Sequence, residues 1–258
     1  MSEERHWKSL KDLEGDIVAC RECSRLVKHR ESVVPKARYR DYDYWRRPVP
    51  GFGDSNAQLM VIGLAPAAHG GNRTGRVFTG DESGRFLVNA LHKAGLANQP
   101  YSEARDDGLR YRGCYLTAAV KCSPPQDRPS KEEFANCSKY LGGELDLLPG
   151  ISSVLVLGQS AFRAFLAYAK VEGASTRGLK FKNGASYRID GLPRLYVSYH
   201  PSPRNTHTGK LKASMLVRLL LRIKRQMGTR PAEIQMNSVE ESMKRGVIRN
   251  HDGTRSVP

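Results

Sequence analysis

The chain has 258 residues, 39% hydrophobic and 26% charged, which is the composition of a globular protein with enough apolar material for a core. Its formal net charge of +16 favours a polyanionic partner, most often nucleic acid, although a solvated basic surface is the alternative. No run of about 18 apolar residues occurs, which excludes a transmembrane helix. The charged stretch 1–16 lacks the apolar segment of a secretory signal, so we expect a cytoplasmic protein.

The first half of the chain changes character three times. Residues 1–30 are predicted to be helical around Cys20 and Cys23, and residues 31–57 are aromatic, basic and rich in proline and glycine, which indicates a loop. A short apolar run then predicts a buried strand over 58–64. A glycine-rich loop over 65–81 follows, and the spacing of apolar residues over 83–94 predicts a helix.

The second half alternates strands with helices. Ser130 and Glu133 form the pattern of a capping box, which predicts a helix from there to about residue 148. Residues 173–186 have the composition of an exposed loop. The remaining predicted elements are strands over 114–120, 153–157 and 195–198, a helix over 158–168, and a basic amphipathic helix over 211–227.

This alternation predicts an α/β fold in three α/β/α layers, with a central, mostly parallel four-stranded sheet. Residues 1–227 are expected to form a single domain. Apolar residues become sparse from Gly228 onward, so residues 228–258 are predicted to be a polar C-terminal tail.

The glycine-rich loop begins directly after a predicted buried strand, at Gly63. Its glycines let the backbone approach a ligand closely, and loops at the carboxyl ends of parallel strands are where open α/β sheets bind ligands. Phe78 stands among small and polar residues, where an aromatic ring can stack on a planar ligand. The alternative is a loop that only turns the chain, with Phe78 tucked into the core, and both interpretations remain open at this point.

A second candidate segment, His200 to Asn205, follows the last core strand and holds an equivalent position. Two prolines stiffen it. His200 could donate to a developing anion, and Ser202 and Arg204 could hold phosphates. Taken alone, an isolated histidine is more often an ordinary surface residue.

The five cysteines indicate a metal site or free thiols. Their odd number in a chain expected to be intracellular argues against a disulfide framework. Cys20 and Cys23 form a CxxC pair that we place on one helical turn, whereas Cys122 and Cys137 are separated by a longer spacing. Four thiolates suit an iron–sulfur cluster or zinc. Cys114 lies inside a predicted strand and is expected to be a buried spare thiol.

Together these segments resemble the uracil-DNA glycosylase superfamily, and most closely its iron–sulfur branch called family 5, or type B. The resemblance covers roughly residues 7–227. It is carried by the sequences GLAPA over 63–67, GRVFTGD over 75–81 and HPS over 200–202, with the four cysteines in their order. The segments 48–54 and 115–122 also look like the family's first two strands with their approaches.

The resemblance implies a DNA-repair hydrolase that flips uracil out of DNA and cleaves its N-glycosidic bond. It implies a structural [4Fe–4S] cluster on Cys20, Cys23, Cys122 and Cys137. It also implies that Phe78 stacks on the extruded base and that His200 stabilises the departing base. The residues expected along the substrate are Gly63, Leu64, Ala65, Pro66, Phe78, Ser202 and Arg204.

Two positions depart from the wider superfamily. Most branches carry a carboxylate or amide where Ala65 stands, and the neighbouring iron–sulfur branch carries a base-reading Asn where Ala118 stands. A pocket without that Asn should discriminate less, which fits a substrate range that includes hypoxanthine and modified uracils. Because Ala65 cannot hold the attacking water, Asn72 and Asp81 are the catalytic candidates for that role, with Asn72 preferred.

Three rival functions remain at the level of the sequence. A non-catalytic zinc module that binds nucleic acid, or an iron–sulfur redox protein, accounts for the charge and the cysteines but leaves the 63–81 loop unexplained. A nucleotide-binding enzyme is disfavoured because the loop lacks both phosphate-binding glycine motifs. The expected partner is DNA containing uracil or another deaminated base. We expect a nucleoid-associated monomer with no membrane contact, in which the tail can contact a partner such as a sliding clamp.

Overall fold

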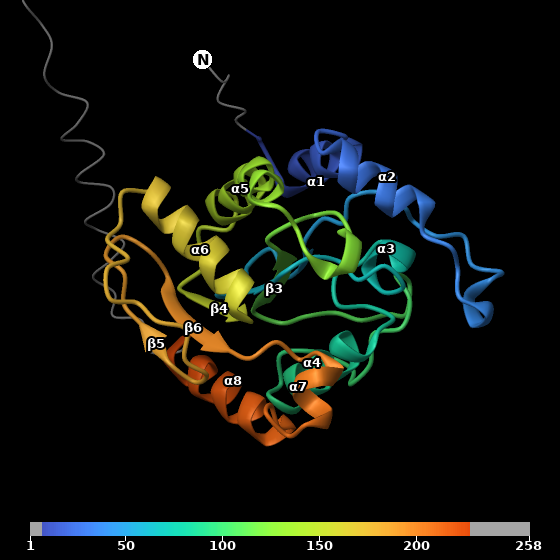
Figure 1. Cartoon of the computed structure of the whole chain (residues 1–258). Helices are drawn as coiled ribbons and strands as arrows, with labels where there is room; N and C mark the ends of the chain where they lie inside the picture. Colours follow the sequence, from blue (N-terminus) through green and yellow to red (C-terminus); the bar gives the residue numbers. More distant parts are fainter. Residues whose placement is uncertain (1–6, 228–258) are drawn as a thin grey trace, which may run out of the picture. The chain divides into compact units, whose positions relative to one another are not determined.

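A six-stranded sheet runs through the centre of the computed structural model, which describes residues 7–227 (Figure 1). The strand order is β1-β3-β2-β4-β6-β5. The strands are β1 (Phe52–Gly53), β2 (Leu59–Gly63), β3 (Cys114–Ala118), β4 (Ser153–Leu157), β5 (Ser186–Tyr187) and β6 (Arg194–Ser198).

The four central strands are parallel, as the alternation of strands and helices predicts. In register, Ile62 of β2 lies between Thr117 of β3 and Val156 of β4. Strands β2, β3 and β4 are buried along their whole length, because helices cover both faces of the sheet. Their residues are therefore mostly apolar on both faces and do not alternate with polar residues. The two edge strands, β1 and β5, are antiparallel and two residues long. They raise the number of strands above the predicted four, because two residues are too few to show a hydrophobic period.

Two pairs of helices form the outer layers. One face packs against α4 (Glu82–Lys93) and α8 (Ala213–Met227), with Leu91 and Leu220 buried in that cluster. The other face packs against α5 (Lys131–Asp146) and α6 (Gln159–Val171). The capping box of Ser130 and Glu133 is present at the start of α5, as predicted. The three layers expected from the sequence are therefore confirmed.

The N-terminal segment differs from its prediction at the CxxC pair. Two helices, α1 (Leu10–Ala19) and α2 (Ser24–Ser32), replace a continuous helical region. Cys20 follows α1 with extended backbone, and Cys23 is the extended residue before α2. The prediction that the two cysteines share one helical turn is therefore wrong. The break places both of them at the junction of the two helices.

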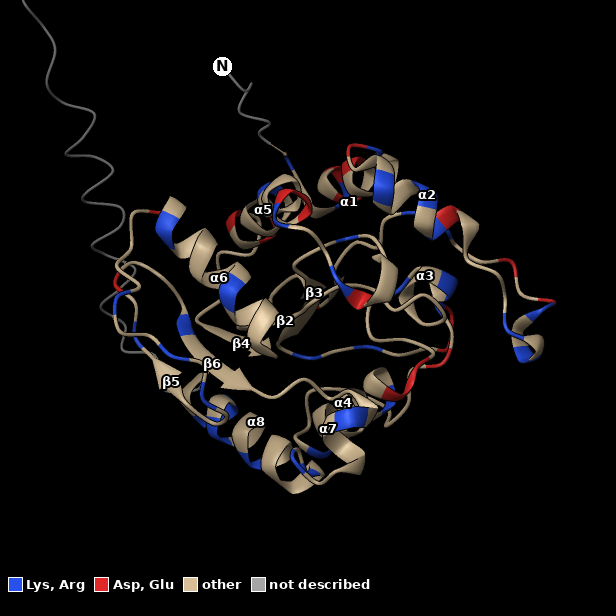
Figure 2. Ribbon diagram, in the orientation of Figure 1, with Lys and Arg blue, Asp and Glu red and all other residues tan. Residues whose placement is uncertain are grey.

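Four short helical turns lie in the loops. They are η1 (Ala37–Tyr39), α3 (Gly71–Thr74), η2 (Pro125–Asp127) and α7 (Pro203–His207). None of them has an apolar period long enough to be predicted. Figure 2 shows that Lys and Arg residues are spread over α2, α6 and α8 and over the loops.

The topology fixes where a ligand can bind. After β2 the chain adds β3 on one side of it and β4 on the other, so the connections diverge at the carboxyl end of β2. Such a switch point leaves a crevice between the diverging loops. Along the described residues, no helix combines the length and apolarity needed to cross a bilayer. The predicted tail, with its clamp contact, lies outside the described residues.

Candidate active site

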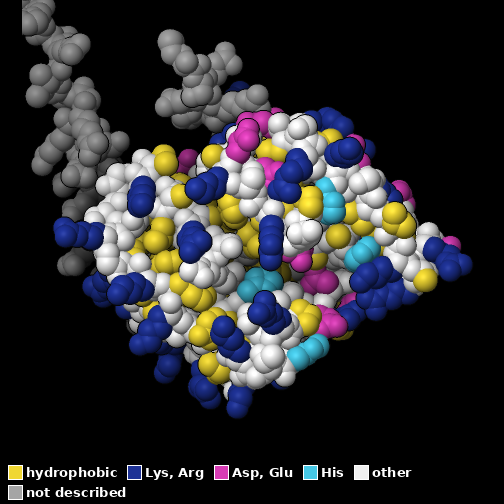
Figure 3. Space-filling model, viewed as in Figure 1, with side chains coloured by type: hydrophobic (Ala, Val, Ile, Leu, Met, Phe, Trp, Pro, Cys, Tyr) yellow, Lys and Arg dark blue, Asp and Glu magenta, His cyan; other side chains and the backbone are white. Residues whose placement is uncertain are grey.

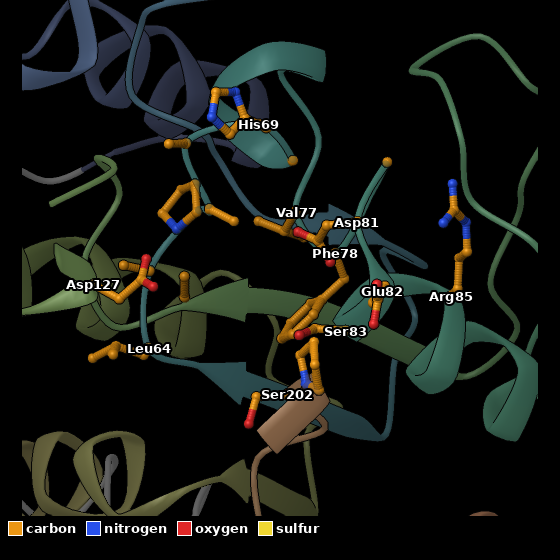
Figure 4. A pocket seen from close by; sticks show the side chains of 18 of the residues that line it. Leu64, His69, Val77, Phe78, Asp81, Glu82, Ser83, Arg85, Asp127 and Ser202 are labelled. Atoms are coloured by element: carbon orange, nitrogen blue, oxygen red, sulfur yellow. The ribbon is translucent and has the colours of Figure 1, made fainter. Parts of the chain in front are cut away.

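A cavity of about 560 Å³ lies at this switch point (Figure 4). That volume is within the range of small-molecule pockets. Its walls come from the loops that follow β2, β3 and β6, and from the segment after α2. The lining residues used below are Lys36, Arg38, Tyr39, Leu64, Ala65, Pro66, His69, Phe78, Asp81, Ala118, Asp127, His200, Ser202 and Pro203.

Phe78 reaches the cavity in an unusual backbone conformation. Its φ is +50°, in the left-handed region that a bulky residue rarely adopts. Its ring lies over Gly63 so closely that a Cβ on that glycine would come within 2.5 Å of the ring. Gly63 is therefore needed for the ring's position. Strained backbone of this kind costs about 1–3 kcal/mol and persists only where the surroundings impose it.

Two buried arginines impose that conformation on the loop. Arg76 donates to Thr79 Oγ1 at 2.9 Å and to both carboxylate oxygens of Asp107 at 2.8 Å. Arg73 donates to the carbonyl of Gly80 at 3.2 Å. Both guanidinium groups are nearly inaccessible to solvent. They hold the two residues that follow Phe78, so the strain is balanced by charge-assisted hydrogen bonds.

His200 lines the cavity directly after β6. Its backbone carbonyl accepts a hydrogen bond from Asn205 Nδ2 at 2.8 Å, which fixes the loop. Gly158, at the end of β4, packs against its Cβ. Burial lowers the pKa of His200 below its ordinary value of 6.5, and the nearby Asp127 opposes that shift. The imidazole is therefore neutral at physiological pH, with one N–H to donate.

Asp127 is a cavity residue that the sequence reasoning missed. It ends η2 with a φ of +55°, following Gln126 at the same φ, so two consecutive non-glycine residues are left-handed. Figure 4 shows Asp127 beside Leu64, across the cavity from Phe78. The only sequence signal was its place after Pro124 and Pro125, which indicates a turn and no particular chemistry.

Asp81 and Asn72 are placed differently, although both belong to the glycine-rich loop. Asp81 lines the cavity, and one of its oxygens caps α4 by accepting from Gly84 N at 2.8 Å. Burial raises its pKa. Asn72 is 1% exposed and donates to the backbone carbonyl of Arg30 at 3.1 Å. The structure therefore brings Asp81 to the cavity and directs Asn72 toward α2.

The remaining predicted substrate residues divide in the same way. Leu64, Ala65 and Pro66 form one wall, and Ser202 lies at the opposite edge with Pro203. Ala118, at the end of β3, also faces the cavity. Arg204 is exposed on α7 and is not part of the lining. Its guanidinium stands outside the cavity, where it can reach only a ligand that extends beyond the mouth.

A second, smaller cavity lies between α1, α2, α5 and the segment after β3. Cys20, Cys23, Cys122 and Cys137 all line it. Cys114 lies apart from them, in β3, where it belongs to a different apolar cluster. Burial raises the pKa of Cys122 to about 11 and that of Cys137 to about 12. Both thiols therefore need a bound cation to be deprotonated at neutral pH.

Arg30 gives this cavity a buried positive charge. It is 2% exposed, and it donates to Cys122 Sγ at 2.9 Å and to the carbonyl of Cys20 at 3.2 Å. Its Nε has no hydrogen-bond partner, and its Nη2 lies 3.9 Å from a carboxylate oxygen of the partly exposed Glu31. A buried charge whose counter-ion is distant and solvated is costly. The cavity is therefore suited to a group that brings negative charge onto the four sulfurs.

The same donors do not form a single-ion site. Within residues 7–227 no group of three histidine, cysteine or acidic side chains converges so as to hold one metal ion. A tetrahedral zinc site would need all four sulfurs about 2.3 Å from one centre. In an iron–sulfur cluster each cysteine binds a different iron, so the sulfurs stand farther apart. The four thiols that line this cavity are the donor type that iron–sulfur clusters and zinc both use.

The face that carries the larger cavity is ringed by basic side chains. Figure 3 shows lysines and arginines around its rim, with histidine and acidic side chains gathered at a hollow near its centre. A basic rim of this kind attracts phosphates, whereas the hollow offers neutral and acidic groups to whatever enters it.

Comparison with known proteins agrees with this geometry. Residues 50–224 match the family model of the uracil DNA glycosylase superfamily. The chain belongs to that superfamily. It is 50% identical over 211 residues to a type-5 uracil-DNA glycosylase of Pyrobaculum aerophilum, covering 82% of this chain and 90% of the relative.

Further relatives agree on the branch. A type-5 uracil-DNA glycosylase of Thermus thermophilus is 47% identical, over 82% of this chain and 95% of the relative. One from Mycobacterium tuberculosis is 43% identical, over 81% and 78%. The resemblance to the type-5 branch of the uracil-DNA glycosylases is thus confirmed over most of the chain.

Proposed function

We propose that this chain excises uracil from DNA by hydrolysing the bond between the base and its deoxyribose. The observation that carries the proposal is the cavity in which Phe78, His200 and Asp81 converge, in a chain that belongs to the uracil-DNA glycosylases. A base inside a duplex cannot reach such a cavity, so the nucleotide must be flipped out at a cost of a few kcal/mol. A mispaired uracil is the cheapest to extract.

Phe78 receives the extruded base. Its ring is held over Gly63 by backbone that the buried arginines fix in advance, so little ordering remains to be done when a base enters. Stacking on an aromatic ring contributes about 1–3 kcal/mol per base and tolerates different bases. Leu64 and Ala118 offer apolar wall in place of amide groups, which supports a range wider than uracil, including hypoxanthine and modified uracils.

His200 stabilises the leaving base. Cleavage of the N-glycosidic bond leaves an anionic base and a sugar with cationic character, and negative charge grows on the base oxygen. The imidazole is neutral because its pKa is lowered, and it still carries one N–H that can donate to that oxygen. One such donor is typically worth about 2.7–4 kcal/mol of barrier.

Asp81 holds the attacking water in this proposal. One of its oxygens accepts from Gly84 N in the cap of α4, and the carboxylate lines the cavity, where it can also accept a hydrogen bond from water. Asn72 braces the loop instead, because its amide is turned toward Arg30. Asp127, another lining residue, acts on His200 through its charge and adds negative potential near the cationic sugar.

The four cysteines would hold a [4Fe–4S] cluster. It would supply a structural link between the α1–α2 junction and the segments around β3 and α5, and no step of the hydrolysis needs it. Arg30 would balance its charge, and Asn136 Nδ2, 3.5 Å from Cys23 Sγ, would add a second donor to sulfur.

The test is single-turnover release of free base from a duplex carrying uracil opposite guanine. His200→Ala should lower the rate about 100-fold to 1,000-fold. His92→Ala is the control, because His92 is exposed on α4 and outside the cavity. A wild-type rate in His200→Ala would remove the leaving-group role. The absence of base release by the wild-type protein would contradict the proposed function itself.

The water-holding role has its own comparison. Asp81→Asn should slow base release more than Asn72→Ala slows it, because only Asp81 reaches the cavity. Asn keeps a cap for α4, so the folded state of Asp81→Asn is retained. If both variants kept the wild-type rate, the water would have to be held by backbone carbonyls or by the DNA itself.

A further inference from the structure

The segment between α2 and β1 projects beside the cavity. We call residues 34–47 the arm. In Figure 1 it extends beyond α2 and α3 as a separate excursion of the chain, and the colouring of Figure 2 marks Lys and Arg residues at its tip. Lys36, Arg38 and Tyr39 of the arm line the same cavity as Phe78. The arm therefore forms one side of the cavity mouth, and Ser202 and Pro203 form another.

Cations and aromatic rings alternate along the arm. Its sequence, VPKARYRDYDYWRR, holds five lysines and arginines against two aspartates, with four aromatic residues among them. Arg38 lies over the ring of Tyr39 at 4.8 Å, and Arg46 lies over the ring of Tyr44 at 5.5 Å. Proteins that bind single-stranded nucleic acid without sequence preference use this combination of backbone-neutralising cations and base-stacking rings.

The base of the arm is firmly anchored. The Arg73 guanidinium contacts the rings of both Tyr39 and Tyr42, with centroid distances of 4.1 and 4.8 Å. The backbone N–H of Trp45 donates to the carbonyl of Arg73 at 3.0 Å, and Tyr44 shares a hydrogen bond of 3.0 Å with His69 Nδ1. Because Arg73 also holds the loop of Phe78, the arm and the base pocket share one support.

Two apolar side chains of the arm have no place in the core. Val34 is 80% exposed, and Tyr42 is 53% exposed although one part of its ring meets Arg73. Solvent-exposed apolar groups that sit on a basic and preformed surface are typical of contact sites. A ring that presents one side to solvent can stack on a base that has lost its neighbour.

We propose that the arm binds the DNA strand next to the flipped nucleotide, with its cations on the backbone phosphates and Tyr42 stacked on a neighbouring base. The proposal rests on the proposed function, because that function makes DNA the ligand at the cavity mouth. It adds a contact surface formed by the 34–47 segment. This surface contacts the strand beside the flipped nucleotide, whereas the cavity contacts the flipped base itself.

The first test measures affinity for a duplex with a tetrahydrofuran abasic analogue, which the protein cannot cleave. Tyr42→Ala should weaken binding about tenfold, whereas Tyr42→Phe, which keeps the ring, should bind like the wild type. Val34→Ala is compared with Val171→Ala, since Val171 is 82% exposed at the end of α6, on the opposite side of Figure 1. Only the Val34 variant should lose affinity.

The second test measures the salt dependence of that affinity. Arg40→Ala should reduce the slope of log K against log salt concentration by about 0.9, the value for one lost phosphate contact. Lys170→Ala, at the exposed end of α6, is the matched charge control and should leave the slope unchanged. Equal slopes for the two variants, together with wild-type binding by Tyr42→Ala, would overturn the proposal.

The outcomes separate this proposal from the proposed function. If the wild-type protein releases uracil while the arm variants bind abasic DNA as their controls do, the arm proposal fails and the glycosylase function stands. If the wild-type protein releases no base while Tyr42→Ala and Arg40→Ala bind DNA less tightly, the arm proposal stands and the function fails.

Discussion

The two cavities of this protein are built on opposite plans. The base cavity is open, is lined by titratable groups such as Asp81 and His200, and depends on a strained residue, Phe78. The cysteine cavity is small, and Lys121 in its wall is bonded to the buried Glu144. The first is arranged for a ligand that must leave, and the second for one that stays.

If that contrast is correct, substitutions behind the cysteine cavity should affect stability, and substitutions at the base cavity should affect the reaction. The largest effect is expected at Lys121, which is 1% exposed and donates to both oxygens of the fully buried Glu144. Lys121→Met leaves that carboxylate unpaired and should cost about 3–5 kcal/mol of unfolding free energy. Urea denaturation measures it.

The matched control for this substitution is Lys139→Met. Lys139 pairs with Glu22 on the surface, where both side chains are about 40% exposed. Loss of such a pair costs at most about 1 kcal/mol. Equal losses in the two variants would mean that the buried pair contributes no more than a surface one, and the contrast between the cavities would be weakened.

The next effect is expected at Arg30. Arg30→Met removes the donor to Cys122 Sγ together with the buried positive charge beside the four cysteines. Hydrogen bonds to charged groups contribute about 1.5–3 kcal/mol, so iron should be lost to a chelator at least tenfold faster. Arg21→Met, which removes an exposed arginine paired with Glu31, should retain iron like the wild type. Iron content over time is the measurement.

A smaller effect isolates the strain at Phe78. Phe78→Gly and Phe78→Ala both remove the ring that would stack on a base, so both should excise slowly. Only glycine adopts a φ of +50° without cost. Phe78→Gly should therefore be more stable than Phe78→Ala by about 1 kcal/mol in thermal or urea unfolding. Equal stabilities would show that the backbone relaxes once the ring is gone.

The smallest effect is a pH shift. Asp127→Asn removes the carboxylate that opposes burial, so the pKa of His200 should fall further below 6.5. Below about pH 6.5 the His200 ring is protonated in the unfolded chain but stays neutral in the folded protein. The free energy of unfolding should therefore decline as pH falls from about 6.5 toward the lowered pKa. The decline should extend to lower pH in the variant. Proton NMR of the histidine ring follows the titration, and an unchanged pKa would show that Asp127 does not act on His200.

The sequence predicted the elements that carry long apolar patterns. The four central strands and the helices α4, α5, α6 and α8 lie within a few residues of their predicted bounds, because each buries a continuous face. The edge strands β1 and β5 and the turn α7 were not predicted. They are held by tertiary pairing and capping, which leave no period in the sequence.

The site was predictable where chemistry follows chain position. Phe78 stands in the loop that follows one predicted strand, His200 stands in the segment that follows another, and both line the cavity. Asp127 was not found, because its approach to His200 depends on two left-handed residues. Asn72 and Asp81 could not be separated from spacing alone, since the short helix α3 turns one of them away from the cavity.

The position of the cysteines in the chain has a consequence for biosynthesis. Cys23 precedes Cys122 by about 100 residues, so at 5–20 residues per second the first pair leaves the ribosome about 5–20 seconds before its partners exist. During that interval the two thiols at the α1–α2 junction lack the two other cysteines, Cys122 and Cys137, that line the same cavity. A cluster held by all four cysteines would therefore form late in synthesis, and its assembly would require the first pair to stay reduced until then.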